Sequence, residues 1–242
     1  MYRATTPSIG LAAGLALWAA GCTGMDFGGE IRVPGNQTHV LAEGESHPSP
    51  ILLPGERLFN IHQTAGSRTP GPEGTAREDA AATNDGSAFC LAEAANGGSA
   101  NAEFKIGHRI ENQTGQALTA EIQVEFDLDY AVTASAEPVA QTLATANLHL
   151  AVLDARNRPV ASAAIVQLNS DMASTQAAMS HRHRLHTVIE PPQRCANVLL
   201  YGKVIGIAAA GQQASARVEI KNLRVRIDCS PAPPASSPAA KP

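Results

Sequence analysis

The chain has 242 residues and a formal net charge of −4, and 44% of its residues are hydrophobic although only 4% are aromatic. This length suits one folded domain with tails. The mildly acidic balance comes without a clustered positive patch, which proteins need to meet a phosphate backbone, so we expect no nucleic-acid partner.

The first residues have the pattern of an export signal. Arg3 precedes an apolar run, Ile9–Trp18, which is too short to span a bilayer as a helix, and small residues follow this run. Residues 1–21 are therefore expected to be removed. Loss of Arg3 with them takes the net charge from −4 to −5.

The segment Ala19-Ala20-Gly21-Cys22 resembles the lipobox of bacterial prolipoproteins, in which small residues directly precede an obligatory cysteine. The resemblance covers residues 1–22 and departs from the usual pattern at Ala19, where leucine is commoner. It implies cleavage after Gly21, a thioether from Cys22 to a diacylglycerol, and a membrane anchor of several acyl chains. Thr23 in place of an aspartate implies an outer-membrane location in the cell envelope. The alternative is an ordinary secretory signal followed by an unrelated cysteine.

Glycine-rich and polar residues 22–48 predict a tether with one short strand at Glu30–Val33. Ile51–Gln63 predicts two short strands around the turn pair Pro54-Gly55. Residues 64–87 have no apolar period and predict a long exposed loop. Residues 230–242 predict a disordered Pro/Ala-rich tail, which leaves a folded domain at 49–229.

The clearest strand pattern is Glu121–Tyr130, in which polar and apolar residues alternate without a break. A period of two over ten residues is typical of a half-buried strand. The preceding strand, Phe104–Ile110, also has its apolar residues at even numbers. The residues between them, Asn112–Gln116, predict a three-residue turn with Gly115 in the left-handed conformation, so we expect the two strands to form a hairpin.

Further strands are predicted on both sides of a turn at Asp154–Pro159, and then towards the C-terminus: Asn147–Leu153, Val160–Leu168, Arg184–Ile189, Asn197–Ala209 and Ala214–Asp228. The nearly continuous apolar run 197–209 predicts a central strand. The apolar parity shifts within the last segment, which predicts a bulge near Lys221 or Asn222. Many strands without helix-period segments predict an all-β fold, an antiparallel β-sandwich or jelly-roll-like domain.

With Cys22 reserved for lipid, Cys90, Cys195 and Cys229 remain for a disulfide, which an oxidising compartment allows. If the last two strands form a hairpin around Gly211–Gln213, a regular ladder places Cys195 opposite Cys229, and we predict a bond between them. Cys90 pairing with either of them is the alternative. An unpaired Cys90 is expected to be an inert buried thiol rather than a nucleophile.

Two groups of polar residues are candidates for metal or catalytic sites. His181, His183 and His186 could bind a transition metal, but the flanking arginines would repel a cation, so a solvated strand edge or loop is expected. The acidic stripe of Glu121, Glu125, Asp127 and Asp129 could suit calcium or a glycosidase pair, yet it lies along one strand. A solvated outer face is expected, with Lys105 and Arg109 pairing with the carboxylates.

Hydrolase, phosphate-binding, zinc-protease and dinucleotide motifs are missing from the sequence, so we expect no enzyme and no cofactor. The function expected is a non-enzymatic envelope lipoprotein that binds a protein partner or serves as an accessory part of an assembly. A β-sandwich module for a glycan or small ligand is the alternative, although the chain after residue 21 has no tryptophan. A hydrolase with scattered catalytic residues is the third hypothesis.

Overall fold

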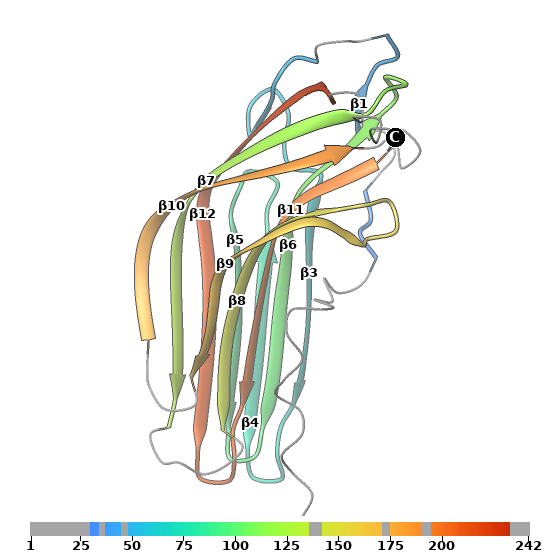
Figure 1. Ribbon diagram of the computed structural model, residues 1–242. Helices are drawn as coiled ribbons and strands as arrows, with labels where there is room; N and C mark the ends of the chain where they lie inside the picture. The colour runs from blue at the N-terminus through green and yellow to red at the C-terminus, as the bar shows by residue number, and fades with distance from the viewer. Residues whose placement is uncertain are drawn as a thin grey trace, which may run out of the picture.

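The computed structural model describes residues 30–33, 37–44, 48–135, 142–170, 175–189 and 195–232. The predicted signal peptide and the lipidation residue Cys22 lie outside the described residues. The described chain forms twelve strands and no helix, and the strands are stacked in two layers (Figure 1). The fold is therefore an all-β, antiparallel-rich sandwich, which confirms the predicted fold class.

Sheet A contains six strands in the order β1-β6-β11-β8-β9, with β3 also paired to β6. Neighbouring strands are antiparallel except for β1, which runs parallel to β6. The nearly continuous apolar run 197–209 lies mostly in β11, which is central in the sheet, as predicted, because it lies between β6 and β8. The strand bounds are β1 (His39–Leu41), β3 (Ile61–Thr69), β6 (Ser99–Asn112), β8 (Leu143–Leu153), β9 (Pro159–Ser170) and β11 (Cys195–Ile207).

Sheet B contains six strands in the order β10-β7-β12-β5-β4, with β2 also paired to β12, and all its pairs are antiparallel. The predicted bulge is confirmed, since the register of β12 on β7 shifts between Lys221 and Arg224 and Asn222 has a φ of 54°. The strand bounds are β2 (Ile51–Leu53), β4 (Thr75–Ala82), β5 (Ala88–Ala95), β7 (Leu118–Ala134), β10 (Thr175–Ile189) and β12 (Gln213–Pro231).

The core lies between the two sheets and is built from alternate residues of each strand. Along β7 the even-numbered residues from Leu118 to Leu128 are buried, while the odd-numbered ones face outward. Many core positions are alanines, for example Ala92, Ala102 and Ala146. A small second apolar cluster lies on the outer face of sheet A, where Ile31 packs with Ile61, Ala151, Leu153, Leu199 and Tyr201.

The predicted hairpin between residues 104 and 124 is wrong, because β6 belongs to sheet A and β7 to sheet B. The predicted turn is present. Gly115 has a φ of 82°, and the Asn112 side chain donates to the carbonyl of Gln116 and accepts from the amide of Thr114. Asn112 also donates to the carbonyl of Ile189 in sheet B. The chain therefore crosses between the layers here, and both strands still turn their even residues to the core.

The predicted loop at 64–87 is also wrong, since most of it lies in β3 and β4. These strands pair with β6 and β5 and form one margin of the sandwich. Most side chains of β3 beyond His62 are exposed, and those of β4 are exposed or half-buried. A margin strand needs little apolar surface, which explains why its sequence has no strand-like pattern.

The predicted tether of residues 22–48 is too long. Ile31 and Leu41 are buried, and β1 pairs with β6, although Glu30–Val33 is not a strand. The predicted tail also begins too early, because β12 continues to Pro231 and pairs with Leu118 of β7. Both ends of the described chain are therefore part of the sandwich.

Gly202 offers a direct test of the core packing. It lies opposite Phe104 in the β11–β6 ladder, and a Cβ atom at this position would overlap the fully buried phenylalanine ring. We expect Gly202→Ala to lower the free energy of unfolding by about 1–3 kcal/mol, because the added methyl group would force the buried ring or the strand to shift. Chemical denaturation measures this loss, with Lys203→Ala in the same strand as the control. Equal stability of the two variants would contradict the packing.

Candidate functional site

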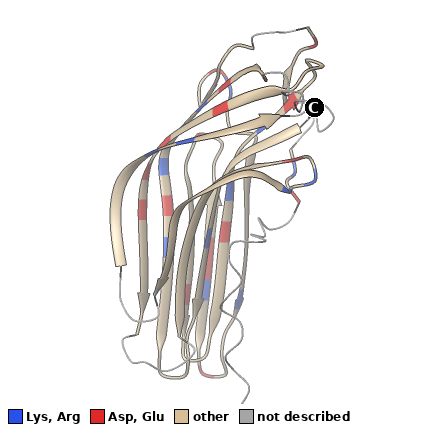
Figure 2. Ribbon diagram, viewed as in Figure 1, with Lys and Arg blue, Asp and Glu red and all other residues tan. Residues whose placement is uncertain are grey.

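Basic and acidic residues alternate along three neighbouring strands of sheet B (Figure 2), and the burial pattern of these strands places them on the outer face. We call this band of residues the charged ladder. Arg182 contacts Glu125 at 2.6 Å, Arg184 lies 3.9 Å from Glu121, and Arg217 lies 4.0 Å from Asp129. It consists of Arg182 and Arg184 on β10, Glu121, Glu125, Asp127 and Asp129 on β7, and Arg217, Glu219, Lys221, Arg224 and Arg226 on β12.

The acidic stripe predicted on β7 is therefore an outward face, but its expected partners are wrong. Lys105 and Arg109 belong to β6 in sheet A, so they cannot pair with it. The cations come instead from β10 and β12, which flank β7 on its two sides. No group of three metal-ligating side chains that could hold an ion occurs among the described residues.

Asp127 of the charged ladder accepts hydrogen bonds from both neighbouring strands. Ser180 of β10 donates to its Oδ1 at 2.6 Å, and Asn222 of the β12 bulge donates to its Oδ2 at 2.7 Å. These two hydrogen bonds lower the pKa of Asp127. A shallow groove of about 240 Å³ runs beside Asp127 and Asp129, with Met179 and Lys221 on its walls. The bulge predicted from sequence thus supplies the Asn222 side chain, which joins β12 to β7 within the charged ladder.

The histidine cluster lies on β10, where residues alternate between two faces. His181 stacks on the ring of Phe126, with centroids 5.7 Å apart, and His183 lies opposite Val124. These two side chains are half-buried, while Arg182, Arg184 and His186 are exposed. The expected strand edge is confirmed, although the strand starts nine residues earlier than predicted, at Thr175.

Cys90, Cys195 and Cys229 are free thiols in this structure. The hairpin on which the Cys195–Cys229 bond depended is wrong, because β11 lies in sheet A and β12 in sheet B. Cys195, at the start of β11, pairs with Glu111 of β6, and Cys229, within β12, pairs with Ala120 of β7. Burial raises the pKa of all three thiols, that of Cys229 to about 11. A raised thiol pKa leaves little thiolate at neutral pH, so these cysteines are poor nucleophiles.

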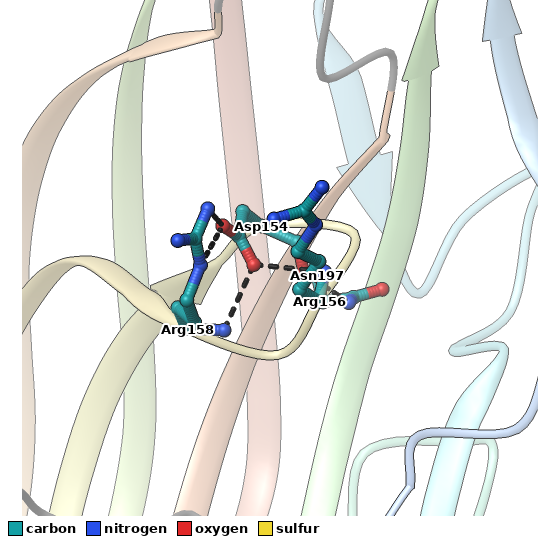
Figure 3. A network of polar contacts seen from close by, with 4 residues as sticks. All are labelled: Asp154, Arg156, Arg158 and Asn197. Atoms are coloured by element: carbon teal, nitrogen blue, oxygen red, sulfur yellow. Dashed lines mark hydrogen bonds and ion pairs between the residues drawn. The ribbon is translucent and has the colours of Figure 1, made fainter.

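A polar network at the β8–β9 turn was not anticipated from the sequence (Figure 3). Asp154 accepts hydrogen bonds from the backbone amides of Arg156 and Arg158, and the Arg158 guanidinium pairs with its Oδ2 at 2.7 Å. Burial opposes ionisation of Asp154, but these contacts outweigh it and lower its pKa. The turn itself was predicted, and an aspartate before a tight turn was the available signal.

The network continues to the N-terminal segment through fully buried Asn197, whose side chain lies 3.5 Å from the Asp154 carbonyl. Arg109 donates to the Asn197 side chain at 2.8 Å and to the carbonyl of Ile31 at 3.1 Å. Gln63 donates to the carbonyl of Arg32 at 2.8 Å. Residues 30–33 therefore pack on the outer face of sheet A, where these hydrogen bonds and the burial of Ile31 hold them.

Two grooves lie at opposite ends of the sandwich. One groove, of about 540 Å³, is lined by His39, Pro48, Leu52 and Arg57 near β1 and β2. Another, of about 530 Å³, is lined by Arg77, Glu93, Thr133 and Ser215. Neither groove is lined by a tryptophan, tyrosine or phenylalanine ring.

No helix in the described part of the chain is long and apolar enough to cross a membrane.

His108 is a buried histidine beside the first of these grooves. Its ring lies 6.0 Å from that of His39, and within the described part of the chain neither of its nitrogens has a hydrogen-bond partner of normal geometry. Burial, with smaller contributions from the nearby His39 and Arg57, lowers its pKa to about 4. His108 is therefore neutral in the folded protein near pH 7.

No protein-family model and no curated protein matches this sequence. Several solved structures are similar at low identity. A family 11 carbohydrate-binding module of the cellulosomal cellulase Lic26A-Cel5E of Clostridium thermocellum is 6% identical, with 70% of this chain and 88% of that chain covered and a TM-score of 0.23. A structure of the infectious bursal disease virus Gt strain is 10% identical, with 78% and 39% covered and a TM-score of 0.22.

The buried state of His108 predicts a pH dependence of stability. Between about pH 4 and 6.5 the unfolded chain binds a proton at residue 108 and the folded chain does not, so the free energy of unfolding falls as the pH falls through this window. We expect a loss of up to about 3 kcal/mol from this group. Denaturation of His108→Leu at pH 4.5, 5.5 and 7.0 should show a smaller slope than the wild type, whereas exposed His186→Gln should retain it. An unchanged slope in His108→Leu would be evidence against this prediction.

Proposed function

We propose that the chain is a lipid-anchored protein of the bacterial outer membrane whose sandwich binds a protein partner. The observation that carries this proposal is the attachment of residues 30–33 to the outer face of sheet A. This attachment gives the chain a short connection between Cys22 and the sandwich. It also makes the two outer faces of the sandwich unequal in their distance from the anchor.

The length of the connection limits where the sandwich can lie. Eight residue steps separate Cys22 from Glu30, and an extended chain covers at most about 28 Å in eight steps. An acylated Cys22 would therefore hold sheet A close to the membrane surface. The outer face of sheet B, with the charged ladder, lies on the opposite side of the core and would be presented to other proteins.

The surface chemistry favours a protein over a glycan as the partner. Sugar sites commonly use exposed aromatic rings, but Tyr201 is buried and donates to Glu103, and Tyr130 packs against the core. The described residues leave mixed charges and isolated apolar side chains exposed on sheet B and its margin, among them Leu52, Met179 and Val188. The polar groove beside Arg77 and Glu93 is where a glycan would be sought.

Replacement of the lipidated residue tests the anchor. We expect Cys22→Ala to move most of the protein from the membrane fraction to the soluble fraction of the cell envelope, since the acyl chains supply the membrane affinity. Cys195→Ala is the matched control and should remain in the membrane fraction. Quantitative immunoblotting of the two fractions measures the effect. Retention of Cys22→Ala in the membrane fraction would contradict lipid anchoring.

Photo-crosslinking in cells tests the binding face. A photoreactive amino acid at Gln176 on β10 should give a discrete crosslinked protein, whereas the same group at Ser162 on β9 should give much less. Both positions are exposed, and they differ in the sheet to which they belong. Purification and identification of the adduct gives the partner. Absence of an adduct at Gln176, together with retention on a glycan array, would replace the proposal with glycan binding.

A further inference from the structure

Strand β10 presents an unusually long and regular free edge. All fifteen of its residues pair with β7 in unbroken register, and among the described strands it has no partner on its other side (Figure 1). Its sequence, from Thr175 to Ile189, contains no proline or glycine. Exposed edges are usually shortened, bulged or blocked by proline, because their unpaired amides and carbonyls can pair with another chain.

The other margins of the sandwich show these protective devices. Strand β9 begins at Pro159 and has two register shifts against β8. Strands β3 and β4 are shorter, with nine and eight residues. The edge of β10 is therefore longer than these margins, and unlike the edge of β9 it has no register shift.

The two faces of β10 differ in chemistry. On the outer face the side chains of Arg182 and Arg184 are 71% and 61% exposed even though each pairs with a glutamate of β7. On the inner face His181, His183 and Leu185 are half-buried over apolar residues, and Met179 is 43% exposed. A strand added to the free edge would thus meet cations on one face and apolar or aromatic surfaces on the other.

Strand β7 shows which sequence suits this environment, because it occupies the opposite side of β10. On its outward side Glu125 lies opposite Arg182, and Arg184 lies opposite Gln123 and diagonal to Glu121. Its inward residues include Ile122, Val124 and Phe126. An arginine guanidinium has five N–H donors, so Arg182 and Arg184 can each donate hydrogen bonds to a second carboxylate on the free side.

We propose that the free edge of β10 binds an extended segment of a partner protein, by strand addition, and that acidic and apolar residues alternate in this segment. The inference rests on the proposed function, since it specifies the protein partner of the same surface. Backbone hydrogen bonds supply the affinity, and the alternation supplies the specificity. A second copy of this chain is a poorer occupant, because antiparallel pairing of two β10 strands brings the arginines of both copies together.

A synthetic peptide with the sequence of Glu121–Tyr130 is the probe. We expect it to bind the full mature chain in detergent, as measured by fluorescence anisotropy. A version with every acidic residue replaced by lysine should bind at least about tenfold more weakly, because its charges face Arg182 and Arg184. Equal binding of both peptides would overturn the proposed specificity.

Protein variants locate the site on β10. The double variant Arg182→Glu/Arg184→Glu should weaken peptide binding by at least about tenfold. The matched control is Arg224→Glu/Arg226→Glu on β12, which changes the charge of the same sheet face equally but away from the edge. It should change the affinity by less than about threefold. Thermal melting confirms that both variants fold. An equal loss in both would show a general charge effect and overturn the placement on β10.

Backbone methylation separates strand addition from simple charge attraction. In an added strand, alternate peptide amides face β10 and the others face solvent. N-methylation of the amides that face β10 should abolish binding, whereas N-methylation of the amides that face solvent should leave it unchanged. Binding that survives both sets would overturn strand addition. If the chain forms a dimer and the Arg182→Pro variant does not, the edge of β10 would be assigned to a second copy of the chain. Failure of every peptide, with the Gln176 crosslink retained, would overturn this inference and leave the proposed function standing.

Discussion

The fold depends on one constraint, which is that every long strand must turn alternate residues toward a core shared by two sheets. The core is unusually rich in alanine, and Gly202 lies directly against the ring of Phe104. Small side chains bury little surface each, so the sandwich obtains its stability from many strands in regular register rather than from a few large residues. The strands are accordingly long, up to nineteen residues in β12.

This constraint explains which parts of the fold could be predicted from the sequence. Alternation in Glu121–Tyr130 correctly identified the buried face of β7, and the parity shift located the bulge near Asn222. Alternation alone does not identify a strand's hydrogen-bonding partner. A hairpin within one sheet and a crossing between two sheets require the same inward parity and the same turn chemistry at Asn112–Gln116. The same ambiguity undermined the ladder expected between Cys195 and Cys229.

Margins of the sandwich were harder to predict than its centre, for a related reason. Strands β3, β4 and the first half of β10 bury few side chains, so selection for apolar residues is weak there. Backbone pairing holds these segments in place, and pairing leaves no periodic pattern in the sequence. The network of Arg109, Asn197 and Ile31 joins residues far apart in the chain, and only the folded structure brings them together.

The two outer faces of the sandwich use polar residues in different ways. On sheet A, Asn197 is buried and hydrogen-bonded, so the loss of a partner there would leave a polar group without compensation. On sheet B the ion pairs of the charged ladder are solvent-exposed, and pairs of this kind contribute less than about 1 kcal/mol each. Stability alone therefore does not account for the charges along β7 and β10. Their effect on recognition is larger, because a row of partly exposed arginines at an open edge discourages pairing with its own copy and favours an acidic strand.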